Sequence, residues 1–168
     1  YEKQEKMANK SLKTLDIITV LMKNDRVREF EWLDTTGWEE SRYNNHNQAK
    51  SQLPVGYEIT DRRTLEVKRI ENKEDYIDLL LEADPSKDVI FKYLNDSDVY
   101  GLKNDDEIVS LAVILHIDKN TLELKNLVTK EEYRNKGYAK KLLKLLCGNY
   151  KQKYNKMIVG TTENNIPF

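Results

Sequence analysis

The stretch LELKNLVTKEEYRNKGYAKKLLKLL (residues 122–146) joins three kinds of sequence in one run. Its first part alternates like a strand, its last part places leucines at helical spacing, and a basic turn with one glycine lies between them. A helix that starts at this turn has first-turn N–H groups without intrahelical partners, and a partial positive charge. Gly137 has no Cβ and Ala139 has a small side chain, so an anion can approach the backbone.

The charge and spacing of this turn favour a site for a phosphate or pyrophosphate group. Four basic residues surround the glycine: Arg134, Lys136, Lys140 and Lys141. The pattern R-x-x-G-x-A is short, however, and a lysine-rich helix that simply faces solvent explains the same residues. Two other phosphate-binding patterns, G-x-x-x-x-G-K-[ST] and G-x-G-x-x-G, are absent from the sequence.

Around this junction the sequence predicts an α/β (α+β) fold, in which a mixed, mostly antiparallel sheet is flanked by helices. The expected elements are a strand at 64–70, helices at 71–83 and 87–95, a hairpin at 98–118 that turns at 104–106, a strand at 121–129, a helix at 137–153 and a strand at 156–162.

The composition of the chain changes near residue 60. Residues 38–52 are almost wholly polar, and residues 53–63 supply a proline, a glycine and a charged turn. We therefore expect a boundary at 60–64, with an N-terminal segment at 1–60 and a separate domain at 61–168.

The stretch at 122–143 resembles the acetyl-CoA-binding segment of the GNAT acetyltransferases, whose pattern is Q/R-x-x-G-x-G/A after a strand. The resemblance extends from about Leu65 to Phe168 through the order of elements above. It implies an enzyme that transfers acetyl from acetyl-CoA to a primary amine of a small molecule or peptide by direct attack. Thr129 stands where the family more often has valine, and Glu131 where it often has proline.

The same resemblance implies which residues bind acetyl-CoA. The backbone of residues 127–129 would pair with the pantetheine arm, and the amides of residues 134–139 would bind the pyrophosphate. The full set of cofactor-binding residues that it implies is Leu127, Val128, Thr129, Arg134, Asn135, Lys136, Gly137, Tyr138, Ala139, Lys140 and Asn164.

Direct acetyl transfer needs a base for the amine and an acid for the leaving thiolate. Glu123 matches a position where the family often carries a catalytic glutamate, although a strand carboxylate that faces solvent or pairs with Lys125 is the alternative. We expect His116 to be structural and Cys147 to pack as a small apolar group among leucines. The sequence has no Cys/His cluster with metal-ligand spacing, so no metal is predicted.

The end of the chain raises a separate question. The family's usual acid is a tyrosine that follows a segment like IPF, with two more strands after it, whereas this chain stops at Phe168. Residues 1–60 could supply those strands as in a permuted chain, with Tyr1 as the acid. Alternatively, another chain, as in a homodimer, covers the edge, or the domain lacks its last strands.

Residues 1–60 allow two layouts. Leu12, Leu15, Ile18 and Met22 fall on one face of a helix, which, with a second helix and a wing, weakly resembles a bacterial winged helix-turn-helix over about residues 7–60. The alternative is a hairpin of residues 15–22 and 27–33. We expect the helical layout, which keeps a DNA-binding transcriptional regulator with a ligand-sensing domain as the alternative function. The segment carries nine basic and ten acidic residues, however, which disfavours DNA.

Composition limits the class of protein. Its 39% apolar residues and mean hydropathy of −0.76 fit a globular protein with a modest core, and no stretch approaches the roughly 18 apolar residues of a membrane helix. A single cysteine cannot form an internal disulfide and fits a reducing compartment. We therefore expect a cytoplasmic protein without a membrane partner, and the net charge of −1 gives no overall attraction for nucleic acid.

Overall fold

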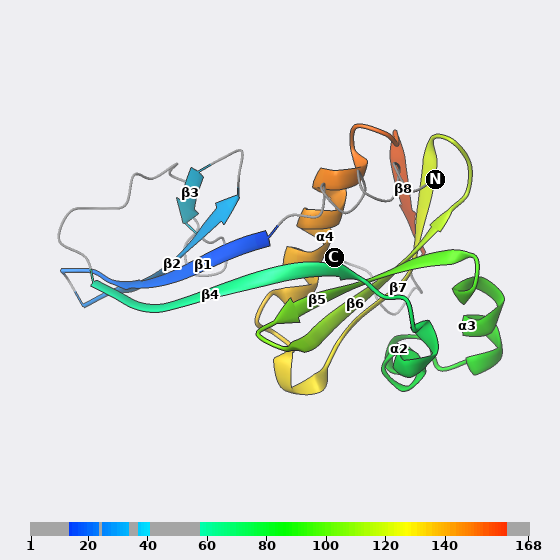
Figure 1. Ribbon diagram of the computed structural model, residues 1–168, viewed down its shortest axis with the longest axis horizontal. Helices are drawn as coiled ribbons and strands as arrows, with labels where there is room; N and C mark the ends of the chain where they lie inside the picture. Colours follow the sequence, from blue (N-terminus) through cyan, green and yellow to red (C-terminus); the bar gives the residue numbers. More distant parts are fainter. Residues whose placement is uncertain (1–13, 24, 34–36, 41–57, 161–168) are drawn as a thin grey trace. The chain divides into compact units, whose positions relative to one another are not determined.

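The computed structural model describes residues 14–23, 25–33, 37–40 and 58–160. The chain divides into two compact units, one formed by residues 1–66 and 103–107 and the other by residues 67–102 and 108–168. Figure 1 shows the elements of both units. Their bounds are β1 (Thr14–Leu21), β2 (Val27–Leu33), β3 (Gly37–Glu40), β4 (Glu58–Arg69), η1 (Lys73–Tyr76), α2 (Ile77–Ala83), α3 (Lys87–Leu94), β5 (Ser97–Asn104), β6 (Glu107–His116), β7 (Thr121–Thr129), η2 (Glu131–Tyr133), α4 (Tyr138–Tyr150) and β8 (Lys156–Val159).

The predicted fold class is confirmed. In the described part of the first unit the strands follow the order β3-β2-β1-β4, and in that of the second unit β4-β5-β6-β7-β8. The pairs β1–β2, β1–β4, β2–β3 and β6–β7 are antiparallel, whereas β7 and β8 are parallel. The result is a mixed, mostly antiparallel sheet arrangement with helices beside it.

The helix predicted for residues 9–24 is wrong, because the described part of this segment contains strand β1 (Thr14–Leu21). It pairs with β2 on one side and β4 on the other, so the alternative hairpin of the sequence analysis is confirmed. Ile17 and Ile18 are both almost fully buried, although neighbouring strand residues face opposite sides. A strand that is buried on both faces has no alternation of apolar and polar residues. The helical spacing of its apolar residues was therefore the only visible pattern, and it predicted a helix. The predicted helix-turn-helix is therefore also wrong, because described residues of its first two helices form strands β1 and β2.

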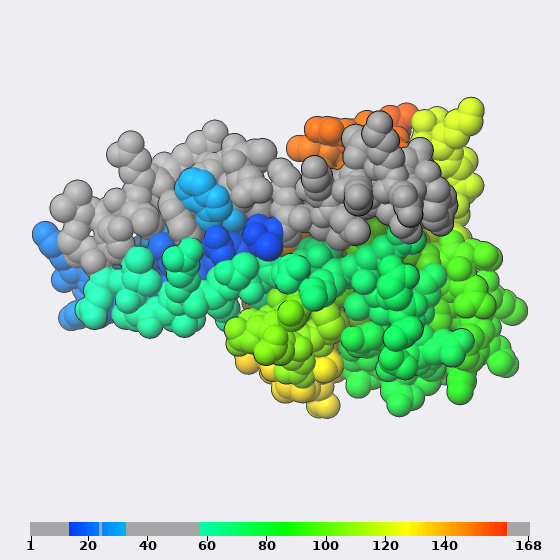
Figure 2. Space-filling view, in the orientation of Figure 1, coloured from blue at the N-terminus to red at the C-terminus, as the bar shows by residue number. Residues whose placement is uncertain are grey.

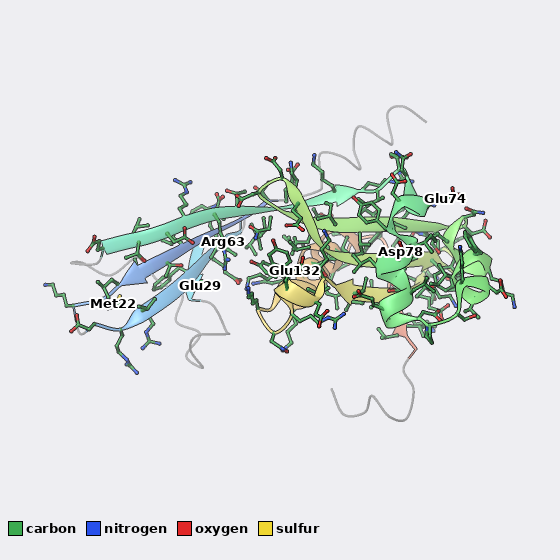
Figure 3. The ribbon with its side chains drawn as sticks, turned by 90° about the horizontal axis from the view of Figure 1, so that it is seen from below. Met22, Glu29, Arg63, Glu74, Asp78 and Glu132 are labelled. Carbon is green, nitrogen blue, oxygen red and sulfur yellow. The ribbon has the colours of Figure 1, made fainter. Side chains whose placement is uncertain are left out.

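The first unit also carries polar contacts across its strands. Arg63 of β4 and Glu29 of β2 form an ion pair at 3.2 Å (Figure 3). The charged turn predicted within residues 53–63 is wrong for residues 58–63, because β4 runs without a break from Glu58 to Arg69. The expected boundary at 60–64 therefore lies inside a strand.

The second unit follows the predicted order of elements. On one side of its sheet, residues of α2 and α3 pack in one core cluster with strand residues that include Leu111, Val113 and Val128. Ala112 and Ile114 alternate with these and are buried on the other side, where α4 lies (Figure 1). Figure 2 shows the residues of α2 and α3, in green, next to one another on the surface of this unit.

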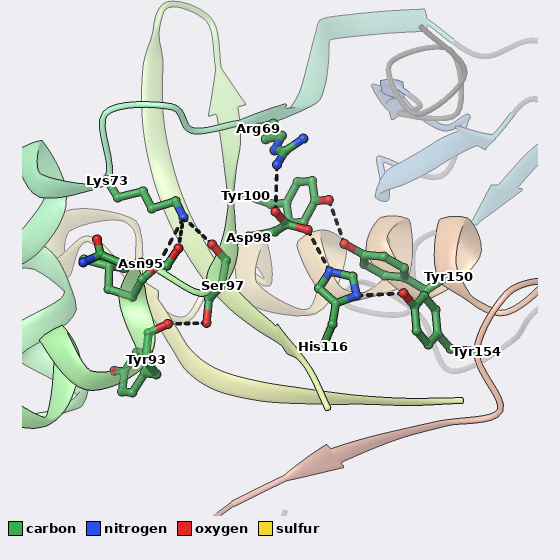
Figure 4. Close-up of polar contacts among 11 residues, drawn as sticks. Arg69, Lys73, Tyr93, Asn95, Ser97, Asp98, Tyr100, His116, Tyr150 and Tyr154 are labelled. Carbon is green, nitrogen blue, oxygen red and sulfur yellow. Dashed lines mark hydrogen bonds and ion pairs between the residues drawn. The ribbon is translucent and has the colours of Figure 1, made fainter. Parts of the chain in front are cut away.

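One lysine holds the end of α3. Lys73 Nζ donates to the carbonyl oxygens of Leu94 at 3.1 Å, of Asn95 at 3.4 Å, and of Ser97 (Figure 4). The Ser97 hydroxyl donates to the Tyr93 carbonyl at 2.6 Å. The contacts to Tyr93, Leu94 and Asn95 satisfy carbonyl groups that a helix C-terminus leaves without partners.

The strands near the N-terminus do not supply a neighbour for β8. β1 pairs with β2 and β4, whereas β8 pairs with β7 and has no second partner within the part of the chain that the structure describes. The permuted arrangement that would make Tyr1 the acid is therefore not supported by the strand order, and Tyr1 itself lies outside the described residues.

Candidate active site

The loop between β7 and α4 presents backbone N–H groups, as the sequence predicts. Asn135 and Gly137 both adopt positive φ angles, 62° and 83°. The first helical hydrogen bond of α4 runs from the Lys141 N–H to the Gly137 carbonyl at 3.1 Å. Within the described chain, no hydrogen bond starts from the N–H of Gly137 or of Ala139. A left-handed residue before a helix start turns such donors outward, which is the geometry of an anion site.

The side chain of Arg134 braces this loop. Its Nε donates to the Thr129 carbonyl at 3.0 Å, and its guanidinium forms an ion pair with Glu82 of α2 at 2.7 Å. Both partners of the ion pair are nearly half exposed, so their attraction alone stabilises little. The guanidinium nevertheless ties the first residue of the motif to the end of β7 and to α2.

Two aromatic rings pack against each other at this loop. Tyr138 is buried, and its ring meets that of Tyr133 edge to face with centroids 6.0 Å apart. Lys136 Nζ lies 5.6 Å from the centre of the Tyr133 ring and donates to the Glu132 carbonyl at 3.3 Å. Asn135 and Lys140 are exposed. These contacts thus help to fix the shape of the loop.

One edge of β7 is open beside this loop. Residues 127–129 pair with residues 110–112 of β6, whereas β8 pairs only with residues 121–124 of β7. Within the described chain, Leu127, Val128 and Thr129 therefore have a strand partner on one side alone. The Ser110 hydroxyl donates to the Val128 carbonyl at 2.9 Å and lies 3.0 Å from the Thr129 hydroxyl, which fixes the end of the strand. An extended ligand could pair with the open edge.

Glu123 lies on the side of the sheet that faces α2 and α3. It pairs with Leu115 of β6 in the strand register. Its carboxylate forms an ion pair with Lys125, whose Nζ lies 3.1 Å from Glu123 Oε1. Lys125 Nζ also lies 5.8 Å from the centre of the Tyr93 ring. The carboxylate that the family resemblance marks as catalytic is thus paired with a neighbouring lysine, as the alternative reading expected.

A polar chain continues from this group into the core. The Asn126 side-chain NH₂ donates to the Leu80 carbonyl at 3.1 Å and to the Tyr93 hydroxyl at 3.3 Å, and this hydroxyl donates to Asp84 at 3.3 Å. Burial raises the pKa of Tyr93, so its phenol stays protonated and keeps donating. Tyr93, Asp84 and Asn126 could not be identified from the sequence, because only folding brings residues of α3 next to β7.

His116 belongs to a separate cluster on the α4 side of the sheet (Figure 4). Its Nε2 lies 2.8 Å from Asp98, which also pairs with Arg69 at 2.9 Å, and its Nδ1 lies 2.7 Å from the Tyr154 hydroxyl. In the same cluster the Tyr150 hydroxyl donates to that of Tyr100 at 2.7 Å. With both ring nitrogens engaged, His116 fits the structural role that we expected.

The remaining predicted residues are Asn164, Tyr1 and Cys147. Asn164 and Tyr1 lie outside the described residues. Cys147 is exposed on α4, so its predicted packing among leucines is wrong. Among residues 14–23, 25–33, 37–40 and 58–160, no group of three or more His, Cys, Asp or Glu side chains is arranged to hold a metal ion. No helix in these ranges is long and apolar enough to cross a membrane.

Three comparisons with known proteins bear on this site. A model of the acetyltransferase (GNAT) family matches residues 57–167. The uncharacterized N-acetyltransferase YvbK of Bacillus subtilis is 37% identical over 73 residues, which make up 44% of this chain and 47% of YvbK. The chain thus spans about half the length of this curated relative.

Two solved structures are similar to this chain in fold and in sequence. A GNAT family acetyltransferase from Elizabethkingia anophelis with acetyl-CoA bound is 33% identical, with a TM-score of 0.56, over 60% of this chain and 67% of that one. A Bacillus subtilis acetyltransferase in complex with CoA is 32% identical, with a TM-score of 0.54, over 61% of this chain and 68% of that one.

Proposed function

Because the chain belongs to the acetyltransferase (GNAT) family, we propose that it is an N-acetyltransferase that moves the acetyl group of acetyl-CoA to a primary amine. The open N–H groups of Gly137 and Ala139 at the start of α4 carry this proposal. They lie at the junction between strand and helix whose charge and spacing favour a phosphate site, and two similar solved structures contain CoA or acetyl-CoA.

In this proposal the backbone holds the co-substrate. The amides within residues 134–139 bind the pyrophosphate, above all those of Gly137 and Ala139, because first-turn donors and the helix dipole favour an anion there. The Arg134 N–H already donates to the Glu131 carbonyl at 3.2 Å. The open edge of β7 at residues 127–129 pairs with the amide groups of the pantetheine arm, as a neighbouring strand would. Arg134 positions the loop through Thr129 and Glu82.

Glu123 is the proposed base. Acetyl-CoA supplies a thioester, and the acceptor must attack it as a neutral amine, so a carboxylate that removes a proton from the ammonium speeds the reaction. Lys125 already provides an ammonium at this carboxylate, which shows that an amine fits beside it. We assign the acid that protonates the leaving thiolate to no described residue. Tyr1, which lies outside the described residues, stays a prediction for this role.

Titration calorimetry with acetyl-CoA tests the proposal. Gly137→Asn and Gly137→Asp are a matched pair, because both side chains tolerate a positive φ and have nearly the same size. Only the aspartate adds a negative charge beside the pyrophosphate, so it should weaken binding by a further ~tenfold or more. Gly148→Asp, at an open position of the same helix, controls for overall charge. Equal affinities of all three variants, or no binding by the unaltered chain at millimolar acetyl-CoA, would reject the proposed site.

A further inference from the structure

An amine of the protein itself lies beside the proposed catalytic base. Lys125 Nζ is 3.1 Å from the Glu123 carboxylate and 5.8 Å from the centre of the Tyr93 ring. The two charged side chains are only 28% and 23% exposed. Carboxylate and aromatic ring together therefore hold this ammonium in one place, in the position relative to Glu123 that an acceptor amine needs.

A β-bulge in the ladder between β6 and β7 places Lys125 and Asn126 on the same side of the sheet. Ile114 pairs with Leu124 and Val113 with Asn126, so Lys125 is the extra residue of a β-bulge. A bulge redirects the side chain of the extra residue, and here Lys125 and Asn126 both reach Tyr93 on the side of α2 and α3. Without the bulge, two successive residues would face opposite sides of the sheet.

Lys125 is also close to the stretch proposed to hold the pantetheine arm. Leu127, the first residue of that stretch, lies two steps further along β7, or about 7 Å of strand. The end of the arm that carries the thioester and the Lys125 amine thus share one short segment of β7.

We propose that Lys125 is a site of self-acetylation, in which this chain is its own amine acceptor. The inference rests on the proposed function and adds a modification site to it. Glu123 takes a proton from the Lys125 ammonium, and the nitrogen lone pair attacks the acetyl carbonyl carbon. A C–N bond forms as the C–S bond breaks, and the leaving thiolate takes up a proton.

Acetylation would change the site that produces it. The product is a neutral amide, which can no longer form an ion pair with Glu123. The carboxylate is then free to accept a proton from a second, external amine. Self-acetylation at Lys125 would therefore convert a lysine-blocked site into one that is open to acceptors.

The test is incubation of the 168-residue chain with acetyl-CoA, followed by peptide mass spectrometry of each lysine. Lys103 is the internal control, because its side chain is 23% exposed and pairs with Asp106 at 3.8 Å but does not belong to the site. We expect Lys125 to be acetylated about tenfold or more faster than Lys103. The half-time should not change on dilution, since the step occurs within one molecule. Glu123→Gln should slow it about a hundredfold, whereas Lys103→Arg should not.

The outcomes separate the two proposals. If calorimetry shows acetyl-CoA binding but Lys125 is not modified, or is modified no faster than Lys103, the self-acetylation is wrong and the proposed function stands. Acetylation that slows on dilution shows transfer between molecules and also rejects it. Lack of both binding and modification rejects both proposals. Lys125→Arg should lose one acetyl group and keep its affinity for acetyl-CoA.

Discussion

The role of Glu123 depends on its neighbour Lys125. Two steps apart on β7, they face the same side and form an ion pair. The sequence alone left two readings of Glu123, a base or a paired surface carboxylate. The structure shows this ion pair. In the proposed self-acetylation the Lys125 ammonium of the pair gives its proton to the Glu123 carboxylate.

At this scale the first prediction concerns the base. Glu123→Gln keeps the size of the side chain but cannot accept a proton, so kcat for an added primary amine should fall about 10²- to 10⁴-fold. The affinity for acetyl-CoA should stay the same, because the proposed pyrophosphate and pantetheine contacts are elsewhere. Steady-state kinetics and calorimetry measure the two effects.

The control for this variant is Lys125→Met, which removes the ion pair and keeps the carboxylate. It should retain activity that Glu123→Gln loses. An unchanged kcat in Glu123→Gln would assign proton removal to another group.

A second prediction concerns buried phenols. Burial raises the pKa of Tyr100 and of Tyr150 above the ordinary value of 10.0. In the unfolded chain both phenols ionise near pH 10, whereas in the folded chain they hold their protons to higher pH. Stability from this source is therefore complete below about pH 10 and is lost as pH rises toward the folded pKa.

Urea unfolding between pH 8 and about pH 11 measures this effect. The free energy of unfolding should decline above pH 10, and the double variant Tyr100→Phe with Tyr150→Phe should decline less steeply, since it removes two of the groups. The same slope in both proteins would show that other groups dominate alkaline unfolding.

At the scale of elements, α3 depends on a residue outside it. Lys73 precedes α2, yet its ammonium reaches the carbonyls of Leu94 and Asn95 at the end of α3. A cation near a helix C-terminus also interacts favourably with the helix dipole. The lysine thus fixes where α3 ends and β5 begins.

Lys73→Met should keep much of the apolar stem and lose the charge and its hydrogen bonds. We expect a loss of about 1–3 kcal/mol in the free energy of unfolding, because hydrogen bonds to charged groups are worth this much. Lys92→Met, an exposed lysine in the last turn of the same helix, should change it by no more than about 0.5 kcal/mol. Equal losses in the two variants, measured by urea titration, would contradict this role of Lys73.

The elements that the sequence predicted well share a physical signature. Residues 77–83 and 87–94 form helices because apolar residues recur at helical spacing and Ser86 caps the second of them. β7 and α4 follow the alternation and leucine spacing on either side of Gly137. In each case local spacing and the buried face agree.

The prediction failed where pairing partners decide. Leu15, Ile18 and Met22 fit a helix face, but β-branched residues such as Ile17 and Val20 favour a strand once neighbours exist on both sides. β2 follows β1 closely in the sequence, but β4 begins only at Glu58, far from β1. The contact between Lys125 and Tyr93 could not be predicted for the same reason, since a bulge and a separate helix create it.

At the scale of the whole molecule, the two units should respond differently to acetyl-CoA. The proposed ligand contacts all lie in the second unit, at residues 127–129 and 134–140. A ligand that binds the folded state alone stabilises it by about 2.7 kcal/mol at a hundredfold excess over Kd. Hydrogen exchange should therefore slow in β7 and α4, and change little in β1 and β2.

Mass spectrometry of deuterium uptake, with and without acetyl-CoA, measures this difference. The Gly137→Asp variant should lose the protection and the Gly137→Asn variant should keep more of it. Protection of β1 and β2 alone would place the ligand in the first unit and contradict the proposed site.

β4 also constrains how the chain can vary in length. Leu65 and Val67 are both buried and two steps apart, and one belongs to each unit. Adding or deleting one residue between them would turn the side chains on one side of the change to the opposite face. Descendants of this gene should therefore gain or lose residues in pairs within β4, and collect single-residue insertions and deletions only outside it.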